Sequence, residues 1–266
     1  MSRIQTIFSA LKANNKKALI PYITAGDPHP KHTVNLLHAM VKNGADMIEL
    51  GIPFSDPMAD GPVIQRASER ALKHKVGLKI VLEMVSEFRQ KDDKTPIILM
   101  GYANPIEAMG QAKFTQAAKA AGIDGVLTVD YPPEECSDFI AALQANGMDS
   151  IFLLSPTSDA ARVNLIVNQA SGFLYYVSLK GVTGAANLDI EEVEARVAEI
   201  RTKTNLPIGV GFGVKDSATA KNVAAFADAI VVGSRMVLAI ENSTEDNLLQ
   251  NITQLMQELR TAIDSK

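Results

Sequence analysis

Short apolar segments rich in β-branched residues recur along the chain, and this recurrence constrains the fold more than any other feature. Most of them are continuous apolar runs without apolar–polar alternation, as expected for strands buried on both faces of a parallel sheet. The predicted strands are Ala18–Ile23, Asp46–Leu50, Pro96–Gly101, Gly125–Val129, Ser150–Leu154, Phe173–Leu179, Pro207–Gly211 and Ala229–Val232.

Helical patterns lie between the predicted strands. Two apolar helix faces are predicted from residues at helical spacing: Val34, Leu37, His38 and Val41, then Ile80, Met84, Val85 and Phe88. Further helices are predicted over Phe114–Ala121, Asp138–Gln144, Ala160–Asn168, Ile190–Arg201 and Ser217–Ala225. Strands that alternate with helices indicate right-handed crossovers and a parallel sheet.

A short motif of glycine, one residue and aspartate precedes three of these strands. It occurs at Gly44–Asp46, Gly122–Asp124 and Gly147–Asp149. Glycine can adopt the left-handed conformation that ends a helix and turns the chain into the next strand. The motif therefore indicates a repeated helix–turn–strand unit.

An open sheet is the alternative to a closed barrel. The dinucleotide fingerprint of open sheets is missing after the first strand, where Thr24–Pro28 stands instead. The even spacing shows no linker, and the 266 residues are close to the roughly 250 of a typical barrel. We therefore predict one (β/α)8 barrel domain over residues 1–266, an α/β fold. An extra N-terminal helix is predicted from Ile4, Ile7, Phe8 and Leu11, and C-terminal helices from Leu248, Ile252, Leu255, Met256 and Leu259.

Charge and cysteine content exclude several classes of protein. The 26 basic and 30 acidic side chains leave a net charge of −4, without a basic stripe for nucleic acid or anionic membranes. No apolar run approaches the ~20 residues that span a bilayer. The only cysteine, Cys136, forms no intrachain disulfide and has a polar, acidic context, so we expect a structural thiol in a cytoplasmic protein.

Two glycine-rich turns follow the last two predicted strands. These are Gly211-Phe212-Gly213 and Gly233-Ser234, the second of which opens a short helix. Glycine lets the backbone approach a ligand closely, and N–H groups at a helix N-terminus favour anions. Because catalytic sites of such barrels lie at the C-terminal ends of the strands, we predict a phosphate site here. The loop Gly181–Gly184 is predicted to close over it.

Carboxylates lie at the end of the second predicted strand and in the loop that follows it. Glu49 is expected to point into the barrel mouth, where partial burial raises its pKa and suits it to acid–base catalysis. The loop Pro53–Pro62 carries Asp56 and Asp60, and composition does not decide which of them is catalytic. A salt-bridged glutamate and turn-capping aspartates are the structural alternatives.

Two other candidates are weaker. His29 and His32 have a spacing found in metal sites, but no cluster of further ligands accompanies them. Lys180 follows the sixth strand and could form a Schiff base with a carbonyl substrate. Its glycine neighbours, however, suggest a mobile loop.

Together these segments resemble the α subunit of tryptophan synthase over nearly the whole chain. The segments that carry the resemblance are Pro21–Pro28, Glu49–Pro62, Met100–Pro105, Gly181–Gly184, Gly211–Gly213 and Gly233–Ser234. Of these, Glu49–Pro62 is the most specific. The resemblance implies a carbon–carbon lyase of tryptophan biosynthesis that cleaves indole-3-glycerol phosphate to indole and glyceraldehyde 3-phosphate.

By resemblance, Glu49 and Asp60 form the catalytic pair. The residues that would bind substrate are Tyr22, Met100, Tyr102, Leu127, Val129, Leu153, Tyr175, Thr183, Gly184, Phe212, Gly213, Gly233 and Ser234. Leu179 and Lys180 stand where the family can have Arg and Ser, and Met100 replaces a Leu.

The resemblance also implies a partner. This is the β subunit, in an α2β2 heterotetramer, and it carries pyridoxal phosphate, whereas the α chain needs no metal or organic cofactor. A Schiff-base aldolase using Lys180, a non-catalytic subunit that binds a phosphorylated ligand, and a lyase that acts without a partner remain open alternatives.

Overall fold

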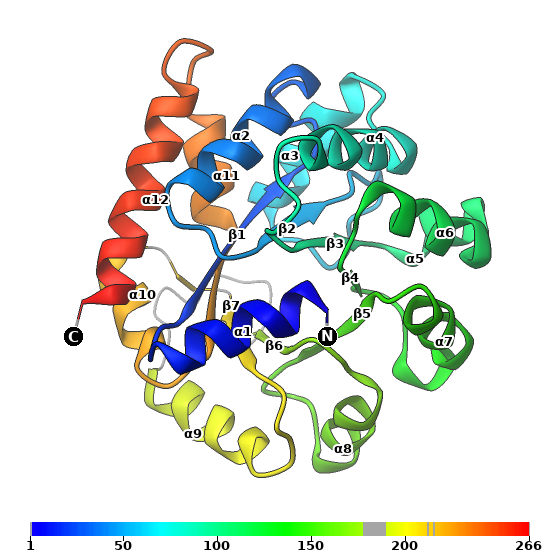
Figure 1. Ribbon diagram of the computed structural model, residues 1–266, viewed down its shortest axis with the longest axis vertical. Helices are drawn as coiled ribbons and strands as arrows, with labels where there is room; N and C mark the ends of the chain where they lie inside the picture. The colour runs from blue at the N-terminus through cyan, green and yellow to red at the C-terminus, as the bar shows by residue number, and fades with distance from the viewer. Residues whose placement is uncertain (1, 178–189, 212, 215, 266) are drawn as a thin grey trace.

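The computed structural model describes residues 2–177, 190–211, 213–214 and 216–265. Within these residues, eight parallel strands close into a barrel in sequence order (Figure 1). The strands are β1 (Ala18–Thr24), β2 (Ile48–Gly51), β3 (Ile97–Gly101), β4 (Gly125–Thr128), β5 (Asp149–Leu154), β6 (Leu174–Val177), β7 (Ile208–Gly211) and β8 (Ala229–Val232). The predicted (β/α)8 barrel is confirmed.

Helices surround the barrel in the described part of the chain (Figure 1). They are α1 (Arg3–Ala13), α2 (Pro30–Lys42), α3 (Pro62–Lys73), α4 (Leu78–Arg89), α5 (Ala103–Met109), α6 (Gln111–Ala121), α7 (Ser137–Ala145), α8 (Ala160–Gln169), α9 (Ile190–Arg201), α10 (Ser217–Ala224), α11 (Ser234–Glu241) and α12 (Leu248–Asp264), with a 3₁₀ turn over Pro133–Glu135. Among these residues, no helix is both long and apolar enough to cross a membrane.

The glycine–aspartate motif has a physical role at the strand entries. Gly44, Gly122 and Gly147 all have positive φ angles, of 102°, 92° and 69°. The carboxylates of Asp46 and Asp124 accept the backbone N–H of the first residues of the neighbouring strands, at 2.8 Å from Leu19 and 2.9 Å from Ile97. These two units therefore tie their own entry turns to the preceding strand, whereas the carboxylate of Asp149 accepts from the Ser2 hydroxyl at 2.7 Å.

Helix α1 closes the N-terminal end of the barrel (Figure 1). Its side chains of Ile4 and Phe8 join the apolar cluster inside the barrel, where the Phe8 ring lies 5.7 Å from that of Phe173. Arg3 donates to Asp124 at 2.8 Å beside the strand entries. The pocket that contains the predicted carboxylates lies at the opposite, C-terminal end of the barrel.

The apolar face of α2 differs from the prediction. The structure buries Leu37 as predicted, but it buries Leu36 and Met40 in place of the predicted Val34, His38 and Val41. Both valines are partly buried and pack against the core, and α2 contacts α4 and α12. For α12 all five predicted residues are buried.

Other boundaries also differ from the prediction. Strand β2 begins at Ile48, because Asp46 lies in the entry turn and binds the Leu19 N–H. Helices α3 and α5 were not among the predicted helices, although Pro62 at the first position of α3 is a helix-start signal. The last residues predicted for the sixth strand, 178–179, lie outside the described residues.

Candidate active site

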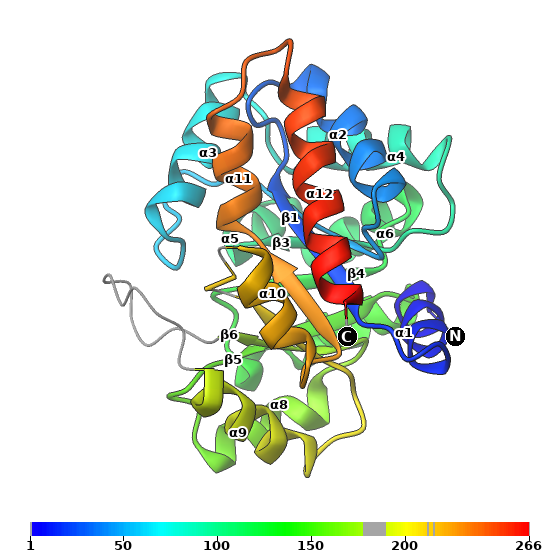
Figure 2. The same ribbon diagram turned by 90° about the vertical axis from the view of Figure 1, so that its left-hand side faces the viewer.

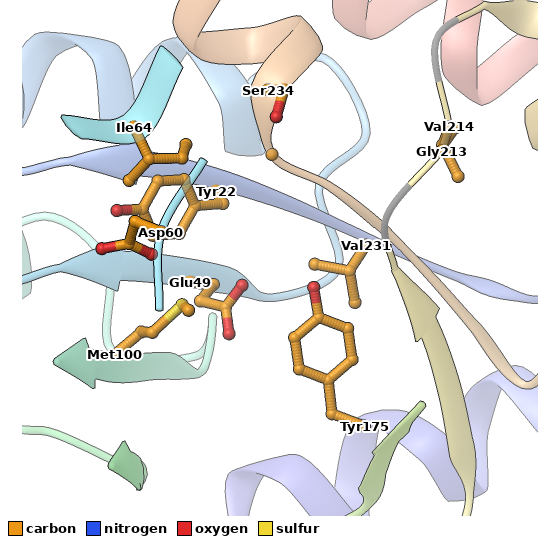
Figure 3. A pocket seen from close by; sticks show the side chains of 11 residues that line it. Tyr22, Glu49, Asp60, Ile64, Met100, Tyr175, Gly213, Val214, Val231 and Ser234 are labelled. Atoms are coloured by element: carbon orange, nitrogen blue, oxygen red, sulfur yellow. The ribbon is translucent and has the colours of Figure 1, made fainter. Parts of the chain in front are cut away.

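A cavity opens at the C-terminal ends of the strands. Its wall comes from five strands, the loop before α3, the first turn of α3, the turn after β7 and the start of α11 (Figure 3). The lining residues are Tyr22, Glu49, Asp60, Ile64, Met100, Tyr175, Gly213, Val214, Val231, Gly233 and Ser234. The cavity therefore brings together both predicted carboxylates and both predicted glycine turns.

Glu49 lies on β2 and is only 2% exposed. Its side chain points into the cavity, and in the described part of the chain its carboxyl group has no hydrogen-bond or ion-pair partner (Figure 3). Burial, reinforced by the nearby charge of Asp60, raises the pKa of Glu49 to about 8. At neutral pH this side chain is mostly a protonated acid.

Asp60 is held at the end of the loop that follows β2. The hydroxyl of Tyr102 donates to Asp60 Oδ2 at 3.1 Å and accepts the N–H of Ala59 at 3.0 Å. Burial raises the pKa of Asp60 to about 6, and the Tyr102 hydrogen bond opposes that rise. Asp60 is therefore mostly ionised at neutral pH.

Asp56 occupies a different place on the same loop. It is exposed, accepts a hydrogen bond from Ser55 at 2.6 Å and does not line the cavity. The path of the loop thus separates the two aspartates that composition left equivalent.

The glycine turns form the other part of the wall. Gly213 has a φ angle of 81°, in the left-handed region that favours glycine. Gly233 is the N-cap of α11, and Ser234 is its first residue. Because the first N–H groups of a helix have no acceptor within it, this turn offers donors and a partial positive charge to an anion. The described lining residues include no Lys or Arg, so the donors that these residues offer to an anion at this turn are mainly backbone N–H groups.

Two tyrosines are placed by close approach to glycine. The Tyr22 hydroxyl lies 3.1 Å from the Thr24 hydroxyl, and its ring rests against Gly51, where a β carbon would be only 2.2 Å from the Tyr22 oxygen. Tyr175 rests in the same way against Gly211. Burial raises the pKa of both phenols well above the usual range, so both are neutral hydroxyl groups.

Several residues predicted to bind substrate lie elsewhere. Leu127, Val129 and Leu153 belong to the apolar cluster inside the barrel and do not line the cavity. Tyr102 is not among the lining residues; it donates to Asp60, which is, and stacks on Phe54 with ring centroids 5.0 Å apart. Thr183, Gly184 and Phe212 lie outside the described residues, as do Leu179 and Lys180.

Sequence reasoning missed three lining residues, Ile64, Val214 and Val231. Ile64 stands four positions after Asp60 in the first turn of α3, so recognition of that helix was the available signal. Val231 lies on β8, where the alternation of inward and outward side chains was the available signal.

The histidines and the cysteine singled out in the sequence are not among the described residues that line the cavity. In the part of the chain that is described, no three His, Cys, Asp or Glu side chains gather as they would around a metal ion. The ring of His29 packs against that of His74 in a tilted arrangement, with ring centroids 4.4 Å apart. Cys136 is buried, which raises its pKa to about 11.

Comparison with known proteins matches the chain along its whole length. The family model of the tryptophan synthase alpha chain matches residues 8–264. The tryptophan synthase alpha chain of Chromobacterium violaceum is 60% identical over 263 residues, which are 99% of this chain and 100% of that protein. That of Ralstonia nicotianae is 57% identical over 265 residues and 100% of both chains.

Solved structures agree with these matches. Tryptophan synthase subunit alpha from Legionella pneumophila superposes with a TM-score of 0.93, at 48% identity over 99% of both chains. A chain of tryptophan synthase from Mycobacterium tuberculosis superposes with a TM-score of 0.89, at 32% identity over 99% of this chain and 100% of that one. The sequence motifs, the barrel and the full-length matches show that the chain belongs to the tryptophan synthase alpha chain family.

Proposed function

We propose that the cavity cleaves indole-3-glycerol phosphate to indole and glyceraldehyde 3-phosphate, with Glu49 and Asp60 as the catalytic residues. The observation that carries this proposal is the pair of carboxyl groups whose environments separate their pKa values, to about 8 for Glu49 and about 6 for Asp60. Such a separation assigns one group as the acid and the other as the anion near pH 7.

The bond to be broken joins C3 of the indole ring to a carbon that bears a hydroxyl group. Glu49 first transfers its proton to C3, which places a positive charge on the ring and its N–H. Asp60, already ionised, accepts a hydrogen bond from that N–H and stabilises the charge. Near neutral pH, Glu49 is already protonated and Asp60 is already ionised, so neither group has to gain or lose a proton before the reaction begins.

Cleavage then completes the proton balance. Glu49, now a carboxylate, takes the proton from the hydroxyl group, whose carbon becomes the aldehyde of glyceraldehyde 3-phosphate. The electrons of the broken carbon–carbon bond return to the ring and restore neutral indole. Because the ring itself accepts electrons, this sequence requires neither a Schiff base nor a cofactor. Each positioned proton transfer contributes about 10²–10⁴ in rate.

The glycine turns would hold the phosphate group of the substrate. Gly213, Gly233 and Ser234 line the cavity together with the carboxylates, so a bound phosphate would orient the reacting carbon toward Glu49. Tyr22, Met100 and Tyr175 would contact the indole and glycerol parts from the described wall. We retain Leu127, Val129, Leu153, Tyr102, Thr183, Gly184 and Phe212 as proposed substrate-binding residues on family resemblance alone.

Family membership implies a β-subunit partner, and we propose the α2β2 assembly for this chain. In that assembly pyridoxal phosphate would belong to the β subunit and would join indole to serine there. The exposed loop that carries Asp56 is a proposed contact, through which the partner could raise the activity of the α chain. With a single buried cysteine, we expect the assembly in the cytoplasm.

The direct test is indole release from indole-3-glycerol phosphate by the purified chain, with and without the β subunit. We expect slow release by the chain alone and faster release with the partner. Glu49→Gln should fold, keep its affinity for glycerol 3-phosphate and lose most activity. No release under either condition would favour a non-catalytic subunit, and near-normal turnover of Glu49→Gln would refute the proposed role of Glu49. Trapping of substrate on Lys180 by borohydride would favour the Schiff-base alternative.

A further inference from the structure

A network of charged side chains joins three elements beside the cavity. Asp27, which has no exposed surface, accepts from Arg70 Nε at 2.6 Å and from Arg70 Nη2 at 2.9 Å. The remaining Arg70 nitrogen, Nη1, donates to Glu241 Oε1 at 2.7 Å. Arg66 donates to both oxygens of Glu241, at 2.8 and 2.7 Å. We call these four side chains the Arg70 network.

Each element in the network also supplies one part of the proposed active site. Asp27 follows β1, which carries Tyr22. Arg66 and Arg70 lie on α3, which begins two residues after Asp60. Glu241 is the last residue of α11, whose first residue is Ser234 in the phosphate turn. Figure 2 shows α3 and α11 side by side, and the two helices are in contact.

An apolar cluster lies between the same elements. Tyr22 of β1, Ile64 and Ala67 of α3 and Val237 of α11 pack together. Tyr22 and Ile64 also line the cavity, so the packing of α3 on α11 forms part of the cavity wall. The apolar contacts hold the helices together but are not directional.

The hydrogen bonds of the Arg70 network, in contrast, are directional and fix how α3 and α11 are oriented. The planar guanidinium of Arg70 forms three hydrogen bonds in fixed directions to two carboxylates, which the ammonium of a lysine cannot reproduce. Helix α11 is a rod of about 10 Å, so a tilt that begins at Glu241 is transmitted to Ser234 at its other end. A buried ion pair contributes little net stability compared with apolar contacts. The main effect of the Asp27–Arg70 pair is therefore to fix the geometry of the elements that it joins.

We propose that Arg70 is a positioning residue that fixes the separation between the phosphate turn at Gly233–Ser234 and the carboxylate of Asp60. The proposal rests on the proposed function, in which one substrate molecule must reach both places at once. Arg70 itself does not line the cavity and would not contact the substrate.

Fragments of the substrate distinguish positioning from simple stabilisation. Glycerol 3-phosphate needs only the phosphate turn, and indole needs only the carboxylate end, whereas indole-3-glycerol phosphate spans both. For Arg70→Met we expect inhibition constants of both fragments within about twofold of wild type, and a loss in kcat/KM for the whole substrate of roughly 10- to 100-fold, mainly in kcat. Arg70→Lys should recover little of this loss.

The matched control is Arg162→Met. Arg162 is another arginine paired with a glutamate: its Nη1 donates to both oxygens of Glu134, at 2.6 and 2.8 Å. Both side chains are exposed, and neither lines the cavity. This variant should keep wild-type values for the substrate and for both fragments.

Further variants address the risk that Arg70→Met unfolds, since it leaves Asp27 buried without its partner. The double variant Asp27→Asn, Arg70→Met removes both charges, and Glu241→Gln weakens the network at its more exposed end while leaving the Asp27–Arg70 pair. Both should fold by circular dichroism and lose kcat/KM for the whole substrate without losing fragment binding.

Two results would overturn the proposal. One is a folded Arg70 variant whose kcat/KM remains at the wild-type value. The other is a loss that is equal for the fragments and the whole substrate, which would mean that the network only holds the fold. Failure of the proposed function has a different signature, because then the wild-type chain itself would release no indole.

Discussion

The hydroxyl of Tyr102 donates a hydrogen bond to Oδ2 of Asp60 at 3.1 Å, and it is fixed in that direction by accepting the N–H of Ala59 at 3.0 Å. Burial raises the pKa of Asp60 to about 6, and this hydrogen bond keeps it from rising further. Tyr102 therefore helps to keep Asp60 ionised near neutral pH, the state in which it can stabilise a cationic ring.

Tyr102→Phe should move the acid limb of the kcat/KM profile to higher pH. Without the hydrogen bond, the pKa of Asp60 rises, and more of it is protonated between pH 5 and 7. Because a hydrogen bond to a charged group contributes about 1.5–3 kcal/mol, we expect roughly tenfold lower activity at pH 5.5 and a smaller loss at pH 8. The measurement is indole release across this pH range.

Tyr176→Phe is the matched control for this prediction. Tyr176 lies on the same barrel but packs outward into the core between strands and helices, so its profile should be that of the wild type. A uniform loss for Tyr102→Phe at every pH would show that Tyr102 acts on binding and leaves the ionisation of Asp60 unchanged.

Glu49→Gln should stabilise the folded chain at alkaline pH. Burial raises the pKa of Glu49 from 4.5 to about 8, so the folded state holds a proton that the unfolded state releases. The resulting stability is complete below about pH 4.5 and is lost as pH rises toward 8. Glutamine does not titrate, so the variant avoids this loss.

The measurement is the thermal midpoint of both proteins at pH 4.5 and pH 8.5. For a chain of this size, each kcal/mol shifts the midpoint by about 2–4 °C, and we expect Glu49→Gln to gain several degrees relative to wild type between the two pH values. Glu83→Gln, at a side chain that is 63% exposed, should show no such gain. A pH-independent difference for Glu49→Gln would refute a raised pKa in the folded state.

The outline of this site was predictable from sequence for a physical reason. Strand ends and helix starts are local features, so Glu49 near the end of β2 and Gly233–Ser234 at the start of α11 could be assigned to one end of the barrel from the sequence. The eight-unit repeat then brought them together. Which of Asp56 and Asp60 faces the cavity was not predictable from these residues alone, because it depends on the path of an irregular loop.

The Arg70 network shows a second limit. Its members, Asp27, Arg66, Arg70 and Glu241, are far apart in the chain, and arginine and acidic residues are common throughout it. No local spacing marks such pairs; only the packing of α3 on α11 selects them. The burial of Leu36 and Met40 in place of Val34 and Val41 on α2 has the same origin, since neighbouring helices decide which side chains are covered.

Asp60→Asn and Asp56→Asn should separate the two aspartates of the loop. Asp60 lines the cavity, whereas Asp56 is exposed and bonded to Ser55 at 2.6 Å. Loss of the charge at residue 60 should lower kcat by about 10²–10³ with a smaller change in KM, because the charge acts on the cationic ring of the transition state. In the isolated chain Asp56→Asn should keep near-normal kcat. The reverse pattern would move the ring-nitrogen role to Asp56.

Gly51→Ala should weaken substrate binding through Tyr22. A β carbon at residue 51 would lie 2.2 Å from the Tyr22 oxygen and 2.7 Å from the adjoining ring carbon, so the ring must move. Ile64 and Val237 pack against Tyr22, and the cavity is the space left to it. We therefore expect a folded protein in which the ring occupies part of the substrate volume.

The measurement is KM for indole-3-glycerol phosphate, expected to rise roughly tenfold while kcat changes less, the pattern of lost uniform binding. Gly77→Ala is the control, because a β carbon there meets no atom within 4 Å. Tyr22→Leu removes the atoms that clash, so adding Gly51→Ala to it should have little further effect on KM. If Gly51→Ala instead raises KM equally with and without Tyr22→Leu, then the substitution acts through the backbone of β2. In that case the close approach of Tyr22 is not the reason that glycine is needed at residue 51.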